Sequence, residues 1–94
     1  MTSENQEWAL HRLDPGIRAA LDAPKEGVSP YAFWQRVYDA AWDWRMKTEH
    51  SLANEGEWYL VESIMHQASA IKWSMLAMAE RYPELREEYL GRKA

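Results

Sequence analysis

Hydrophobic residues recur at helical spacing along most of this chain, and no stretch carries a competing strand pattern. Proline and glycine separate the helical stretches. Asp14-Pro15-Gly16 has the form of an N-cap followed by proline at the first helical position, and Ser29-Pro30 repeats that form. Gly91 suits the position just after a helix. The predicted elements are an N-terminal segment over 1–13, a short helix over 14–23, long helices over 30–53 and 57–82, and a short helix over 83–91.

The two long helices are predicted to run antiparallel, because only the short polar break Asn54-Glu55-Gly56 separates them. The predicted fold is therefore a single all-α domain over 1–94. It is an antiparallel helical hairpin with short flanking helices.

Both long helices offer more apolar surface than one seam between them would use. On the first, a wide arc contains Phe33, Trp34, Val37, Tyr38, Ala41 and Trp44. On the second, the polar side is interrupted by Tyr59 and Trp73. We expect self-association into a helical bundle to bury the excess. The alternative is that terminal residues such as Trp8, Leu10 and Leu85 fold back over it.

The composition supports the expected self-association and narrows the possible classes of function. The 94 residues include six Trp, five Tyr and one Phe, more rings than a thin helical layer can hide. A net charge of −4 argues against a nucleic-acid interface, and no apolar run is long enough to span a membrane. The chain has no cysteine and its first residues do not resemble a signal peptide, so we expect a cytoplasmic protein.

Arg45 and Lys72 stand inside apolar arcs rather than on the solvated strips of their helices. Each could extend its charged end to water, or pair with a carboxylate such as Glu49, one turn beyond Arg45. Each could also hold an anionic ligand stacked on a neighbouring ring. The candidate partner or ligand contacts are Trp34, Tyr38, Trp42, Arg45, Lys72 and Trp73.

Two sets of polar residues give weaker signals of catalysis or metal binding. Glu62, His66 and Ser69 share one helical stripe with Trp73, but nothing in the sequence marks a nucleophile turn or an oxyanion hole. Glu49 and Glu62 stand opposite each other across the predicted turn, beside His50, which leaves a small bundle metalloprotein as an alternative. No role for His11, His50 or His66 follows from their spacing, and no cofactor is predicted.

Two short motifs resemble known families. Arg45 and His50, with four residues between them, resemble the signature of HEPN ribonucleases, which place such a pair in a dimer cleft. Met46 departs from the small polar residue that usually follows the Arg. The stretch EWYLVESIMHQASAIKW, with Trp58, Gln67 and Ser69, resembles the second helix of phage cyclic-nucleotide sponges. That resemblance implies an oligomer of helical hairpins that sequesters immune second messengers.

The sequence therefore favours a non-enzymatic interaction protein (an inhibitor, adaptor or assembly subunit) that forms a homo-oligomer and binds a protein partner. The alternative is an oligomeric binder of a small anionic ligand such as a cyclic nucleotide, as in phage anti-defence proteins.

Overall fold

The computed structural model describes residues 13–91, and these residues form helices and turns with no strand. The all-α prediction is confirmed for this part of the chain. Trp8, Leu10 and His11 lie outside the described residues. The elements are α2 (Pro15–Asp22), α3 (Pro30–Lys47), the 3₁₀ turn η1 (Leu52–Asn54), α4 (Glu55–Arg81), the 3₁₀ turn η2 (Pro83–Leu85) and α5 (Arg86–Leu90).

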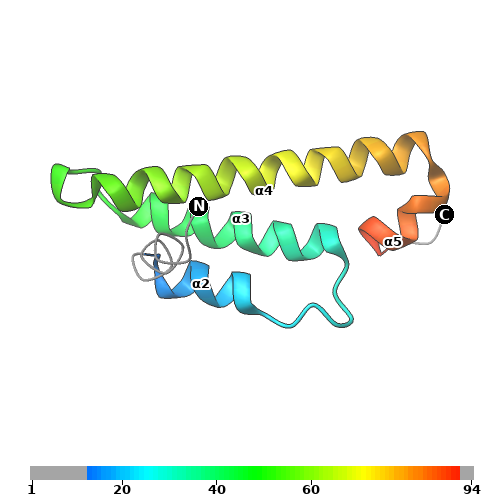
Figure 1. Cartoon of the computed structure of the whole chain (residues 1–94), viewed down its shortest axis with the longest axis horizontal. Coiled ribbons are helices and arrows are strands. Elements are labelled where there is room, and N and C mark those ends of the chain that lie inside the picture. Colours follow the sequence, from blue (N-terminus) through cyan, green and yellow to red (C-terminus); the bar gives the residue numbers. More distant parts are fainter. Residues whose placement is uncertain (1–12, 92–94) are drawn as a thin grey trace, which may run out of the picture.

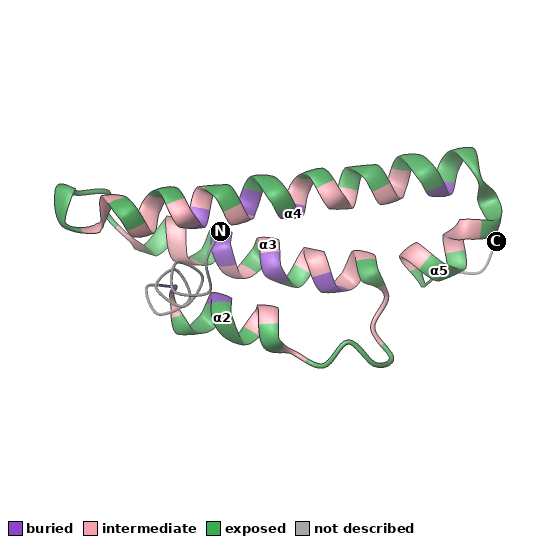
Figure 2. Cartoon of the chain, viewed as in Figure 1, coloured by how far each residue is buried: buried purple, intermediate pink, exposed green. Residues whose placement is uncertain are grey.

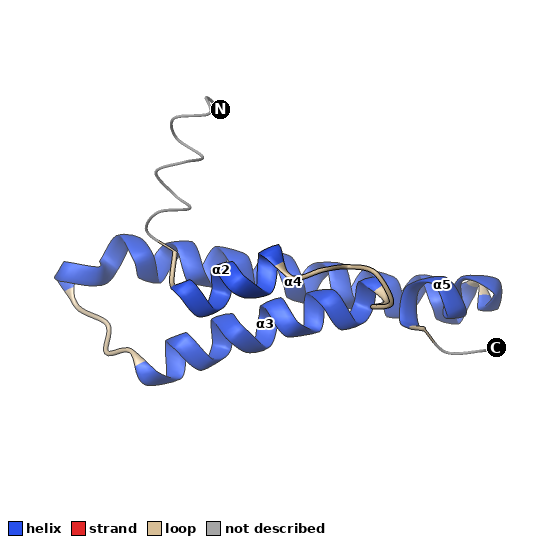
Figure 3. Ribbon diagram, turned by 90° about the horizontal axis from the view of Figure 1, so that it is seen from below, coloured by secondary structure: helices blue, strands red, loops and turns tan. Residues whose placement is uncertain are grey.

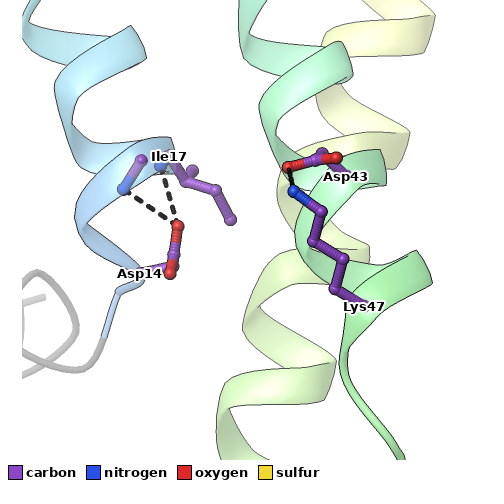
Figure 4. A network of polar contacts seen from close by, with 5 residues as sticks. Asp14, Ile17, Asp43 and Lys47 are labelled. Atoms are coloured by element: carbon purple, nitrogen blue, oxygen red, sulfur yellow. Dashed lines mark hydrogen bonds and ion pairs between the residues drawn. The ribbon is translucent and has the colours of Figure 1, made fainter.

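The capping residues read from the sequence begin the first two described helices. The Asp14 carboxylate accepts hydrogen bonds from the backbone N–H groups of Gly16 at 2.9 Å and Ile17 at 3.3 Å (Figure 4). The Ser29 hydroxyl accepts a hydrogen bond from the Ala32 N–H at 3.2 Å. Both caps are followed by proline, whose missing N–H costs nothing at that position. At the other end of the chain, Gly91 closes α5 in the left-handed conformation, with φ of 69°.

The connection between the long helices differs from the predicted one. The first long helix ends at Lys47 rather than at residue 53, and the second begins at Glu55, so residues 48–54 join them. The side chain of Asn54 explains the early end. It donates a hydrogen bond to the Glu49 carbonyl at 2.8 Å and accepts one from the Ser51 N–H at 2.9 Å. These local bonds compete with continuation of the helix.

Helices α3 and α4 lie side by side and run in opposite directions, while α2 packs along them (Figures 1 and 3). The buried residues come from all three helices: Leu13 stands just before α2, and the others include Ile17 of α2, Phe33, Val37 and Ala41 of α3, and Val61, Met65 and Ala68 of α4. Figure 2 shows these buried positions on the facing sides of the helices.

Helix α4 is nine residues longer than α3 (27 against 18), and its C-terminal part extends beyond the start of α3 (Figure 1). The η2–α5 segment turns back at this end and contacts both α3 and α4. The molecule is accordingly elongated, with extents of 48 × 27 × 22 Å. No helix among the described residues is long and apolar enough to cross a membrane.

Candidate interaction surface

The six residues predicted to contact a partner or ligand do not gather in one pocket. Trp34 lines a hollow of about 300 Å³ with Phe33 and the loop residues Lys25 and Val28. A second hollow, of about 350 Å³, lies between α4 and α5 against Met75, Met78 and Tyr89. Neither hollow contains Tyr38, Trp42, Arg45, Lys72 or Trp73.

Arg45 is engaged within the chain. Its guanidinium lies 3.0 Å from a Glu62 carboxylate oxygen, across the seam between α3 and α4, and 5.5 Å from the centroid of the Trp58 ring. Glu49, which the sequence offered as one possible carboxylate partner, lies beyond the end of α3, and Glu62 of α4 takes that place. The Arg45 and Glu62 side chains are about one-third exposed, at 35% and 28%. Water therefore screens the pair partly.

Lys72 lies over tyrosine rings. Its ammonium nitrogen is 4.6 Å from the centroid of the Tyr38 ring and 5.8 Å from that of Tyr31. Tyr38 is in turn stacked on Trp42, with centroids 6.4 Å apart and planes 9° from parallel. Tyr31, Tyr38 and Trp42 stand at i, i+7 and i+11 on α3 and so share one face of that helix. Lys72 therefore contacts one candidate residue, Tyr38, directly, and Trp42 is next to it only through the Tyr38 ring.

A second aromatic cluster lies at the turn between α3 and α4, and the sequence did not predict it. The imidazole of His50 stacks on Trp58 at 4.6 Å and 8°, and meets Tyr59 edge-on at 6.2 Å. Trp44 contacts the Trp58 ring from α3, at 5.8 Å. His50 was expected on a continuing helix. Only its place in the 48–54 connection brings it to Trp58.

The polar sets that suggested catalysis or metal binding are not assembled into such sites. Glu62, the carboxylate of the proposed stripe, is paired with Arg45, and His66 is exposed on α4. Among residues 13–91, no group of three or more His, Asp or Glu side chains is arranged to hold a metal ion.

Several large apolar side chains of the described residues are exposed to solvent. The large exposed ones are Trp42, Met46, Leu52, Tyr59, Trp73, Met78 and Tyr82. Trp73 is 67% exposed and Trp42 is 46% exposed. Both were predicted contact residues, and both present most or much of an indole ring to solvent. Trp34, by contrast, is half-buried against Phe33, with ring centroids 5.2 Å apart.

Tyr59 carries a polar contact on this surface. Its hydroxyl donates a hydrogen bond to Glu55 Oε1 at 3.2 Å. That hydrogen bond and the charge of the carboxylate raise the pKa of Tyr59 above its usual value of 10.0. Tyr59 therefore stays neutral, as a hydrogen-bond donor, well above physiological pH.

No protein-family model, curated protein or solved structure matches this chain. Its function is therefore argued from the surface described above.

Proposed function

We propose that this chain is a small, non-enzymatic helical interaction protein that self-associates and binds a protein partner through exposed aromatic side chains. The observation that carries the proposal is the exposure of Trp42 and Trp73 on a domain of only 94 residues. Burying a large apolar side chain is worth roughly 1.5–3 kcal/mol. Tryptophan is also one of the residue types enriched where a few side chains dominate binding.

Ligand binding has weaker support than protein binding, because both candidate cations are already engaged. An anion at Arg45 would compete with Glu62, which lies 3.0 Å away. An anion at Lys72 would draw the ammonium from the tyrosine rings that it covers. The exposed indole rings of Trp42 and Trp73 are uncharged, so a partner that covers them has no ion pair to displace. A flat protein surface therefore fits them better than a small charged molecule does.

In the proposed assembly, two chains pair so that their long helices α3 and α4 form a bundle of four. Exposed apolar side chains of α4 would then face a second copy, as in helical bundles generally. The remaining exposed rings would be available to a different protein.

Sedimentation velocity over a range of protein concentrations tests self-association directly. We expect the sedimentation coefficient to rise with concentration toward that of a dimer or larger assembly. Trp42→Gln and Trp73→Gln then test which exposed indole ring mediates the association, which should weaken when that ring is removed. Both side chains are exposed, so the fold should survive, as checked by far-UV circular dichroism. A coefficient that stays at the monomer value at every concentration would refute self-association.

A further inference from the structure

Helix α4 carries a repeating stripe of exposed residues, which is bordered by His50 of the connection at Tyr59 and by the hollow beside α5 at Ala70. Its positions follow one another at alternating steps of four and three residues, the spacing of a coiled-coil seam. All of them are exposed. The stripe, called here the outer seam, consists of Tyr59, Ser63, His66, Ala70, Trp73 and Ala77.

Large and small side chains are distributed along the outer seam in a self-complementary way. If a second α4 runs antiparallel and is centred on residue 68, Trp73 of one chain lies level with Ser63 of the other. On the same register, Tyr59 lies level with Ala77, and His66 with Ala70. Every large side chain therefore meets a small one, which is the condition for close packing of two helices. A parallel, in-register pairing would instead place Trp73 against Trp73 and Ala70 against Ala70.

Charges beside the outer seam agree with the same register. Glu55 of one chain lies level with Arg81 of the other, so opposite charges stand at both ends of the contact. Both residues lie at the ends of α4, Arg81 exposed and Glu55 half-buried, and both have long side chains. Near the centre, the flanking residues Gln67 and Ser69 are uncharged. The antiparallel arrangement thus sets no like charges against each other near the two-fold axis.

We propose that the outer seam of α4 binds the same seam of a second copy, antiparallel and centred on residue 68. This inference rests on the proposed self-association and specifies its surface. The seam extends over about 27 Å of helix from Tyr59 to Ala77, at a rise of 1.5 Å per residue. An isologous contact of this kind closes as a two-fold dimer and leaves the Trp42 face of α3 free for another protein.

A charged substitution near the two-fold axis tests whether the outer seam forms the dimer contact. Ala70→Glu puts two carboxylates near the dimer centre while replacing an alanine that is exposed in the single chain. We expect the dimer dissociation constant to rise by about 100-fold or more, because an unpaired charge is costly to bury. Ala19→Glu makes the same substitution at an exposed position of α2, and is expected to leave the dissociation constant unchanged. Ala77→Glu, toward the end of the outer seam, provides a second test if Ala70→Glu fails to fold.

Cysteine cross-linking tests the register, and the chain's lack of cysteine makes single-cysteine variants unambiguous. His66→Cys and Ala70→Cys are prepared separately, mixed, and oxidised. In the proposed dimer the two cysteines of a mixed pair lie level, whereas like cysteines are offset by about 6 Å along the helices. Because disulfides require closely spaced Cα atoms, only the mixture should cross-link efficiently.

The outcomes separate this inference from the broader proposal. Loss of association in Ala70→Glu but not in Ala19→Glu, with cross-links confined to the mixture, supports the outer seam. If Ala70→Glu and Ala77→Glu both associate as the unmodified chain does, the outer seam is not the contact. If Ala70→Cys alone cross-links efficiently, the antiparallel register is wrong. Self-association stands in both cases. If the unmodified chain is monomeric at every concentration, both proposals fail.

Discussion

Truncation of Ile17 should show that α2 belongs to the hydrophobic core. Ile17 is fully buried, and it packs in one cluster with Ala41 of α3 and with Val61 and Met65 of α4. Ile17→Ala removes three carbon groups, each worth about 0.8 kcal/mol on burial, for a total of about 2.4 kcal/mol. The cavity left behind adds to this loss. We therefore expect a decrease of about 3 kcal/mol in the free energy of unfolding.

Urea denaturation followed by far-UV circular dichroism measures this loss, with all proteins at one concentration so that any association contributes equally. Leu52→Ala is the matched control, because Leu52 is 90% exposed in the connection between α3 and α4. Its effect should stay within about 0.5 kcal/mol. If Ile17→Ala lowers the free energy of unfolding no more than Leu52→Ala does, α2 does not pack in the hydrophobic core against α3 and α4, and the fold described above is wrong.

Three further perturbations follow from specific contacts. Asp14→Ala removes the acceptor of two backbone hydrogen bonds at the start of α2 and should cost about 1 kcal/mol in urea denaturation; an unchanged midpoint would show that the cap contributes nothing. A double-mutant cycle on Arg45 and Glu62 should give a coupling below about 1 kcal/mol that shrinks in salt, since both side chains are partly exposed; a larger, salt-independent value would contradict this. Glu55→Gln should lower the pKa of Tyr59 by removing the carboxylate that raises it, as followed by NMR titration of the tyrosine ring signals. The Tyr59–Glu55 contact favours the neutral phenol, so its small stabilisation is present below pH 10 and lost as pH rises through the elevated pKa.

The helix beginnings could be predicted from the sequence because their causes are local. Asp14 and Ser29 are each followed by proline, and a capping side chain acts on backbone groups only two or three residues away. The end of α3 was predicted six residues too late. Its cause is also local, but it lies in the side-chain hydrogen bonds of Asn54, which compete with a helix that composition alone favours.

The contacts of the candidate residues were harder to predict because they depend on register between helices. The sequence singled out Arg45 and Lys72 as cations within apolar arcs, but their contacts are made with residues of the opposite helix. The position of Glu62 relative to Arg45 follows from how α3 and α4 pack, and a single sequence does not contain that information. The outer seam was visible only as two aromatics interrupting a polar side, since exposure of its small residues emerges from the fold.

Native mass spectrometry of the unmodified chain over a wide concentration range tests the central claim, self-association, most directly. We predict a dominant species at twice the 11.1 kDa chain mass or at a higher multiple, with no retained small molecule. An adduct of a few hundred daltons on that assembly would favour the anionic-ligand alternative over a protein partner. A species at the single-chain mass at every concentration would contradict self-association through the exposed aromatic surface.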